Sequence, residues 1–219
     1  MPLQPSQKDM KMLEVLYRTK KFNKLEIATK KLIQKYPNIA PLLNILGFAL
    51  HKQGHLKKAV ISYEQAIVIS PKFVFAHNNL GNVFKDLGEF DKALSKYQHA
   101  IKLNPNYAEA YYNQGLVYKK ICKYNESIKS LEYALKIKSD YIDAYFDLGQ
   151  ILITVGKFEE AIKNFQKVIS LKPDFATAYN NIFFTLLYMK KNDHNFFTSL
   201  TKKFRSSLKI IDPNLLLKY

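Results

Sequence analysis

The sequence predicts an all-α protein built from helix pairs stacked in a row. One pattern of helix, turn and helix is written three times in succession, over 74–107, 108–141 and 142–175. Glycines recur at intervals of 34 residues at Gly47, Gly81, Gly115 and Gly149. A fixed interval of this length indicates an array in which each unit buries its apolar face against its neighbours.

The composition fits an ordered chain that does not span a membrane. Hydrophobic residues make up 47% of the 219 residues and only seven are glycine. Apolar residues come at helical spacing, and no run reaches the ~18 residues that a membrane span needs. The N-terminal residues contain no unbroken apolar core of signal-peptide length. The single cysteine, Cys122, fits a reducing compartment, so we expect a cytoplasmic protein.

The net charge of +16 is unevenly distributed. The excess lies at the two ends, 1–39 and 176–219, and the regular repeats between them are near neutral. Clustered positive charge attracts phosphates, which makes nucleic acid a conceivable partner. However, arginine occurs only at Arg18 and Arg205, and the many lysines look like codon bias and also favour solubility. We therefore do not expect nucleic acid to be the partner.

The N-terminal third is the less regular part of the array. Residues 1–5 are expected to be disordered, and a degenerate first repeat follows over 6–39, where Pro37 ends its second helix. The second repeat, 40–73, is cleaner. Gly54 falls at its tight turn, where a left-handed backbone suits glycine.

The following three repeats pair small residues with large ones. Each of the glycines that recur at 34-residue intervals lies inside a first helix, where glycine lowers helix propensity by about 1 kcal/mol. The expected compensation is a close approach of the second helix. Large side chains then fill the remaining space, among them Tyr97 and Phe165. Small residues recur on the second helices at Ala59, Ala93, Ser127 and Ala161.

The C-terminal part departs from this pattern. A partial repeat occupies 176–192, with Phe183 in place of the glycine. A different amphipathic helix is expected over 193–211, where it would shield the apolar end of the array as a capping helix. Residues 212–219 look like a linker or tail, and its apolar run Leu215–Leu217 is a candidate contact for a homo-dimer.

The chain resembles tetratricopeptide repeat (TPR) proteins over roughly 6–189. Departures are local: Cys122 replaces a turn glycine, Ser139 a closing proline, and His77 and Leu43 a large aromatic residue. The resemblance implies a right-handed TPR superhelix whose first helices line a concave groove. The motif residues are Leu80, Gly81, Ala93, Tyr97, Ala100, Pro105, Tyr111, Tyr145, Ala161 and Pro173.

The resemblance also implies which side chains face that groove. An asparagine amide offers two donors and an acceptor, so a row of amides can bind the backbone of an extended peptide. Tyr112 and Phe146 would add aromatic contacts. The alternative is that these asparagines are merely solvated. The groove-facing candidates are Asn44, Asn78, Asn79, Asn82, Lys85, Tyr112, Asn113, Leu116, Lys119, Phe146, Asp147, Gln150, Asn180 and Asn181.

The most direct functional prediction is a non-catalytic scaffold that binds a protein or peptide segment in the groove. Some TPR domains clamp a C-terminal carboxylate, but Asp143 and Asp147 stand where basic residues would be needed and should repel it. Residues 176–219 also resemble the junction that follows the TPR arm of O-GlcNAc-transferase and SPINDLY-like glycosyltransferases. An alternative is therefore a substrate-recruiting arm whose catalytic half is absent.

The sequence contains no motif that predicts catalysis or a cofactor. No phosphate-binding glycine loop, nucleophile elbow or zinc-protease motif occurs. His51 and His55 are four residues apart, but no third ligand is near in sequence, so a metal site is not expected. We expect no enzyme activity and no cofactor.

Overall fold

The computed structural model describes residues 4–192, and for 190–192 it describes the backbone only. These residues form eleven helices and no strand, which confirms the predicted all-α class. The chain divides into two compact units, 1–139 and 140–219. The predicted capping helix, the tail and the candidate dimer contact lie outside the described residues. No helix among those described is long and apolar enough to cross a membrane.

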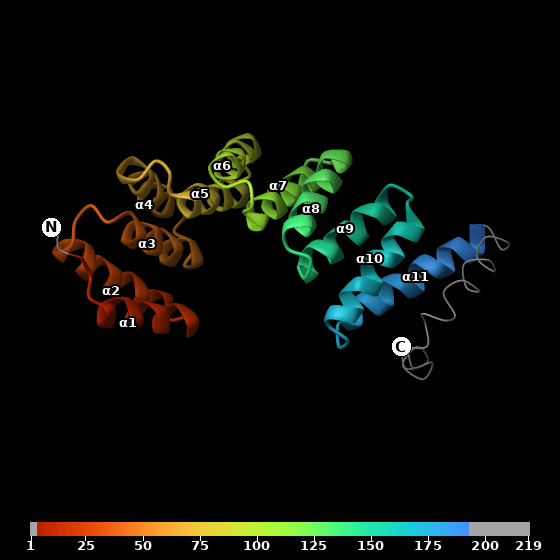
Figure 1. Ribbon diagram of the computed structural model, residues 1–219, viewed down its shortest axis with the longest axis horizontal. Helices are drawn as coiled ribbons and strands as arrows, with labels where there is room; N and C mark the ends of the chain where they lie inside the picture. Colours follow the sequence, from red (N-terminus) through yellow and green to blue (C-terminus); the bar gives the residue numbers. More distant parts are fainter. Residues whose placement is uncertain (1–3, 193–219) are drawn as a thin grey trace. The chain divides into compact units, whose positions relative to one another are not determined.

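The helices follow one another as first and second members of pairs (Figure 1). Unit 1 contains four pairs: α1 (Gln7–Arg18) with α2 (Phe22–Lys35), α3 (Ala40–Lys52) with α4 (Leu56–Ile69), α5 (Val74–Asp86) with α6 (Phe90–Leu103), and α7 (Ala108–Lys120) with α8 (Tyr124–Ile137). Unit 2 contains the pair α9 (Ile142–Thr154) and α10 (Phe158–Leu171), followed by α11 (Ala176–Asn192).

A left-handed residue closes the first helix of every pair. Each is followed by a residue whose N–H donates to the carbonyl five positions back, as from His55 to Leu50 at 2.9 Å. This pattern is a Schellman cap, which satisfies carbonyl groups at the helix end. The left-handed residues are Lys20, Gly54, Gly88, Cys122 and Gly156, with φ angles of 54°, 78°, 78°, 59° and 78°. The turn predicted at Gly54 is confirmed.

The glycines inside the first helices allow the close approach that the sequence predicts. A Cβ built on Gly81 would lie 2.6 Å from Cε1 of Tyr97, whose side chain is fully buried. Gly47 faces Tyr63 and Gly149 faces Phe165 in the same way. Because these rings fill the space that a Cβ would occupy, each of these three pairs packs around one large side chain of its second helix.

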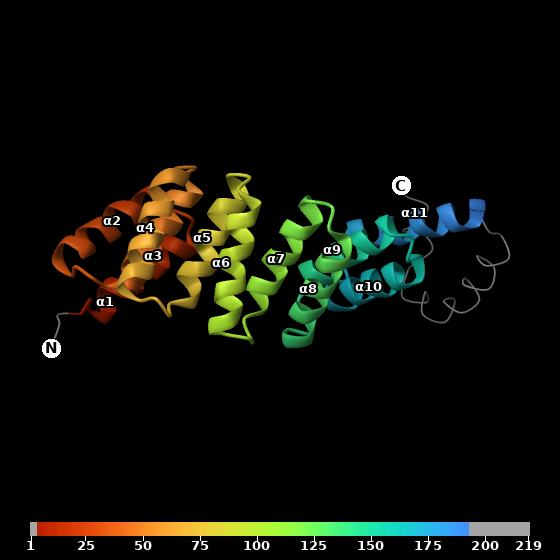
Figure 2. The same cartoon turned by 90° about the horizontal axis from the view of Figure 1, so that it is seen from above.

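In unit 1 each second helix also packs on the first helix of the next pair, α2 on α3, α4 on α5 and α6 on α7 (Figures 1 and 2). In addition, α3 contacts α5, and α5 contacts α7. The three first helices therefore lie side by side. We call the surface that they share the first-helix face.

Candidate functional site

Four asparagines on the first-helix face are joined in pairs across neighbouring helices. Nδ2 of Asn79 on α5 donates to Oδ1 of Asn44 on α3 at 3.0 Å. Nδ2 of Asn113 on α7 donates to Oδ1 of Asn78 on α5, also at 3.0 Å. Each bond joins residues 35 positions apart, so it repeats with the array. We call Asn44, Asn78, Asn79 and Asn113 the asparagine ladder.

The ladder bonds decide which polar atoms each amide still offers. Asn44 and Asn78 accept through Oδ1, so their Nδ2 hydrogens remain as donors. Asn79 and Asn113 each use one Nδ2 hydrogen, so they retain Oδ1 as an acceptor and a second N–H. Asn78 is only 4% exposed, and the other three are half-buried. The ladder thus combines bonds between helices with further donors and acceptors on its half-buried members Asn44, Asn79 and Asn113.

Asn82 and Lys85 continue the polar surface along α5. The hydroxyl of Tyr97 donates to Oδ1 of Asn82 at 2.8 Å. Lys85 is half-buried, and this burial lowers the pKa of its ammonium group; Asp86 acts in the opposite direction and Lys52 adds to the lowering. Asp86 itself contacts Nε2 of His51 on α3 at 2.7 Å. This contact too joins residues 35 positions apart.

The remaining predicted residues divide between α7 and unit 2. Tyr112 is half-buried on α7. Phe146 on α9 packs against Phe165 and Phe175, with ring centroids 5.7 and 5.1 Å away. Asp147 and Gln150 are half-buried on the same helix. The structure therefore brings together the predicted residues of α3, α5 and α7, while those of α9 and α11 belong to unit 2.

On α11 the two asparagines lie differently from the ladder. Asn180 is exposed, and Asn181 is half-buried with its Nδ2 donating to the carbonyl of Thr177 in the same helix at 2.8 Å. A bond within one turn of a helix satisfies the amide locally and links no other element. Within unit 2, Asn181 therefore forms no counterpart of the bonds that join α3, α5 and α7.

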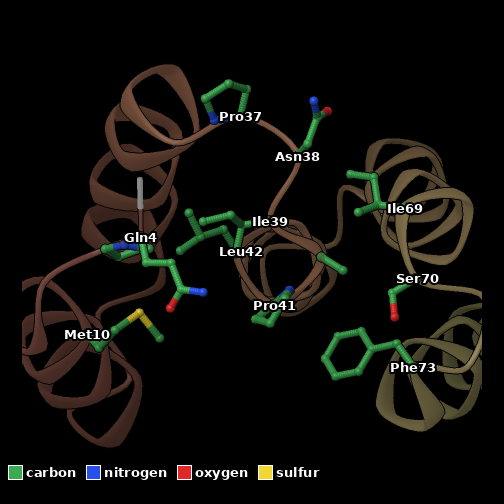
Figure 3. Close-up of a pocket in the computed structure, with 12 residues that line it drawn as sticks. Gln4, Met10, Pro37, Asn38, Ile39, Pro41, Leu42, Ile69, Ser70 and Phe73 are labelled. Carbon is green, nitrogen blue, oxygen red and sulfur yellow. The ribbon is translucent and has the colours of Figure 1, made fainter. Parts of the chain in front are cut away.

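An apolar cavity that the sequence did not predict opens at the N-terminal end of unit 1. Its volume is about 670 Å³. Met10 on α1 and Phe73 before α5 lie on opposite sides of Pro41 on α3 (Figure 3). Met10 occupies the position one repeat before Asn44, so the cavity adjoins the row that continues into the ladder. The lining consists of Gln4, Pro5, Met10, Pro37, Asn38, Ile39, Ala40, Pro41, Leu42, Ile69, Ser70 and Phe73, none of which titrates.

An aromatic cluster is a second feature that the sequence did not reveal. The ring of Phe48 on α3 lies 4.8 Å from that of Tyr17 and 5.9 Å from that of Phe22. Nζ of Lys52 lies 5.5 Å from the centre of the Phe48 ring. Phe48 stands one repeat before Asn82, so the polar surface of α5 becomes aromatic on α3. The 34-residue interval could have revealed this cluster, because it places Phe48 in the same groove-facing row as Asn82.

The described residues contain no cluster of three or more His, Cys, Asp or Glu side chains able to hold a metal ion. His51 contacts Asp86, while His55 is exposed at the start of α4. The groups gathered on the first-helix face are amides, aromatic rings, ammonium groups and the His51–Asp86 pair. Such groups suit hydrogen bonding and side-chain contact with another chain.

The fold and this face define a helical repeat protein with an interaction surface. The tetratricopeptide repeat models match residues 108–141 and 142–175, and a TPR repeat model matches 47–88 and 81–121. The chain belongs to the tetratricopeptide repeat family, as its sequence motifs predicted. No curated protein gives a significant match.

Several solved structures share this fold. MamA is 27% identical, with a TM-score of 0.65 over 80% of this chain and 99% of MamA. A thermophilic TPR protein from Thermus thermophilus is 19% identical, with a TM-score of 0.69 over 83% of this chain and 98% of the other. YrrB, described as a TPR protein with an unusual peptide-binding site, is 22% identical, with a TM-score of 0.63 over 87% of this chain and 96% of YrrB.

Proposed function

We propose that the chain binds an extended segment of a partner protein along the first-helix face of unit 1. TPR proteins generally act as non-catalytic scaffolds for protein interactions, and the family membership assigns this broad role. The observation that carries the finer proposal is the asparagine ladder. Its two bonds hold four amides in fixed orientations across three neighbouring helices.

The ladder suits recognition of a peptide backbone. An extended segment presents N–H and C=O groups in alternation, and it needs acceptors and donors opposite them. Asn79 and Asn113 offer Oδ1, while Asn44 offers Nδ2. Because their bonds to one another fix the amides before a ligand arrives, little side-chain entropy is lost on binding. Such contacts do not depend on the side chains of the segment.

The apolar cavity supports an anchoring contact at one end of the face. A volume of about 670 Å³ accommodates a large apolar side chain, and cavities of this kind supply much of the binding energy of a segment. Met10, Phe73 and Pro41 provide apolar walls. The neighbouring Phe48 ring offers a further surface for an aromatic contact. YrrB, whose fold is similar, is described as having a peptide-binding site.

The test is affinity capture from native cell extract with the full chain carrying Asn79→Ala and Asn113→Ala. We expect this variant to lose most captured partner, because two backbone-binding amides are gone. The matched control carries Asn23→Ala and Asn125→Ala, two exposed asparagines on second helices, and should capture as much partner as the wild type. Circular dichroism verifies that both variants remain folded. Equal capture by all three proteins would contradict the proposal.

The recruiting arm of a glycosyltransferase is a narrower version of the same role. It stays a prediction from the sequence around 176–219, most of which lies outside the described residues. The reading frame that follows Tyr219 in the genome decides it, because a catalytic domain encoded there would support the arm.

A further inference from the structure

The first two helices of the array, α1 and α2, enclose a groove of about 470 Å³. Its floor is apolar, and Met12 from α1 and Ile27 from α2 are 43% and 57% exposed. Lys24 and Lys31 stand on the α2 side, seven residues and thus about two helical turns apart. None of the lining residues belongs to α3, α5 or α7. The end groove, as we call it, is lined by Asp9, Met12, Leu16, Lys24, Ile27, Ala28, Lys31 and Leu32.

The second helix pair shows what lies against the same side of a pair. Three positions of the end groove recur 34 residues later in a groove beside α4, which Ile33 and Pro37 also line. Ile33 on α2 packs in one apolar cluster with Leu43 on α3. A second helix therefore lies against this side of the second pair, whereas among the described residues only α1 and α2 line the end groove. The recurring positions are Asp9 and Leu43, Ile27 and Ile61, and Lys31 and Gln65.

The acids at this end of the chain are all engaged within it. Residues 1–39 contain nine Lys or Arg and three Asp or Glu. Glu14 and Glu26 each form an ion pair with the basic residue four positions later in their own helix, at 2.6 and 2.7 Å. Asp9 accepts hydrogen bonds from the N–H and the hydroxyl of Ser6 at 3.1 and 2.7 Å. The lysines of the end groove therefore receive little neutralisation from these acids.

Lys24 and Lys31 form the cationic edge of the groove. Both are exposed, and no carboxylate of residues 4–192 lies within ion-pair distance of either ammonium group. The aliphatic stems of lysines can lie along an apolar surface while the charge stays at its rim. An apolar floor with a cationic edge is complementary to a ligand that has an apolar centre and an acidic edge.

We propose that the end groove binds an amphipathic helix of a partner protein, whose apolar stripe packs between α1 and α2 and whose acidic side chains face Lys24 and Lys31. A helix is the occupant that fits, because a helix lies against the equivalent side of the second pair. The spacing of the two lysines requires carboxylates about two turns apart on the bound helix. This surface is separate from the first-helix face, so the inference does not depend on the proposed function.

The chain's own amphipathic segment, 193–211, is not the occupant that we propose. It carries four basic residues and only Asp193 as an acid, so like charges would meet at the groove. The chemistry of the groove therefore points to a different protein. The basic residues of the segment are Lys202, Lys203, Arg205 and Lys209.

The test begins with a phage-displayed library of helical peptides selected on the full-length chain. Counter-selection on a Met12→Lys, Ile27→Lys variant removes peptides that bind elsewhere, and its two extra positive charges also remove those that bind by charge alone. We expect the survivors to carry apolar residues at helical spacing, with Asp or Glu at two positions about seven apart. Survivors without acids, basic survivors or no survivors would each overturn the proposal.

The best peptide, labelled with fluorescein, is then titrated by anisotropy at low salt. Lys24→Gln, Lys31→Gln should weaken its binding about tenfold, because two exposed ion pairs are lost. The matched control is Lys57→Gln, Lys58→Gln, on the exposed start of α4, and should leave the affinity unchanged. A peptide whose acids are replaced by their amides should bind the wild type and the Lys24→Gln, Lys31→Gln variant equally. Unchanged binding of the acidic peptide to that variant contradicts the site.

Two further measurements distinguish other surfaces and other ligands. The Asn79→Ala, Asn113→Ala variant should bind the acidic peptide as well as the wild type does, and a loss there would place the peptide on the first-helix face instead. Vesicles of phosphatidylglycerol and phosphatidylcholine provide a different anionic surface. Co-sedimentation that requires Ile27 and Lys31 and that the acidic peptide does not compete away would overturn the helix in favour of lipid. Circular dichroism verifies that every variant remains folded.

Discussion

The hydroxyl of Tyr97 donates a hydrogen bond to Oδ1 of Asn82, whereas the hydroxyl of Tyr63, one repeat earlier, is buried with no partner among the described residues. The two tyrosines fill the same place opposite a helix glycine. The difference arises on the facing helix, where Phe48 stands at the position of Asn82. The tyrosine hydroxyl therefore has a hydrogen-bond partner in the α5–α6 pair and none among the described residues in the α3–α4 pair.

Removal of the two hydroxyl groups should have unequal effects on stability. Tyr97→Phe deletes a hydrogen bond, so we expect the free energy of unfolding to fall by about 1 kcal/mol. Tyr63→Phe deletes a buried hydroxyl that has no partner, so we expect no loss and a gain of up to about 1 kcal/mol. Urea unfolding of the full chain, followed by circular dichroism, measures both. Equal losses in the two variants would show that the Tyr63 hydroxyl does find a partner.

Gly81→Ala should destabilise the chain although alanine favours helices. The new Cβ would lie 2.6 Å from the ring of Tyr97, which is fully buried. Overpacking costs about 1–3 kcal/mol, against about 1 kcal/mol gained in helix propensity. We therefore expect a net loss of up to about 2 kcal/mol. In a Tyr97→Ala background the same change should no longer be harmful, and a loss that persists there would exclude the ring as its cause.

Cys122→Gly should stabilise the chain. Cys122 has a φ of 59° at the turn where Gly54, Gly88 and Gly156 stand in other pairs. The left-handed conformation costs a residue with a Cβ about 1–2 kcal/mol, part of which is offset by the greater freedom of glycine in the unfolded chain. We expect a gain of about 0.5–1 kcal/mol in thermal or urea unfolding. Cys122→Ala keeps the Cβ and should show no gain, so a gain in both variants would implicate the thiol instead.

The stability of the chain should depend on His77 below neutral pH. His77 is 4% exposed, and its Nε2 lies 2.8 Å from the carbonyl oxygen of Pro71, so Nε2 carries the hydrogen. Its buried Nδ1 has no hydrogen-bond partner within residues 4–192 and would have to accept the second proton. Burial lowers the pKa of His77, the bond to Pro71 partly opposes this, and His99 and Lys96 lower it further.

The sign of the pH effect follows from that lowered pKa. Below about pH 6.5 the unfolded chain binds a proton at His77 more readily than the folded chain, so acid favours unfolding. The stability that neutral His77 contributes is fully present above the pKa of His77 in the unfolded chain, and it is lost as the pH falls through that pKa. His77→Leu, which copies Leu43 at the equivalent position, should reduce the loss of stability between pH 7 and pH 5. His55→Gln changes an exposed histidine and should not, and equal pH profiles for all three proteins would contradict the assignment.

Much of the fold was predictable because its constraints repeat. The glycines that recur every 34 residues predicted the close approach between Gly81 and the ring of Tyr97. Glycine weakens a helix, so its presence there indicates that a neighbouring side chain needs the space of a Cβ. Lys20 shows the limit of this reasoning. It adopts the left-handed turn one repeat before Gly54, but a lysine gives no conformational signal of its own. Only the interval of 34 residues could have identified it.

Sequence reasoning predicted which asparagines lie together on the first-helix face, but not the hydrogen bonds between them. The register placed Asn78, Asn79 and Asn113 in one surface region, and the structure joins Asn113 to Asn78 there. A sequence does not show whether two amides bond to each other or to a ligand, because both require the same residue type. The cavity beside Met10 was missed for another reason, since most of its lining comes from loops and a degenerate repeat.

The asparagine ladder has a consequence for how such a chain can lengthen. Its two bonds connect α3 to α5 and α5 to α7 by the same offset of 35 residues. A tandem duplication of 74–107 would insert another copy of Asn78 and Asn79. Each new amide would then have an asparagine of a neighbouring repeat as its hydrogen-bond partner. Growth by whole copies would therefore extend the asparagine ladder without any further substitution, so gene duplication alone can lengthen the first-helix face.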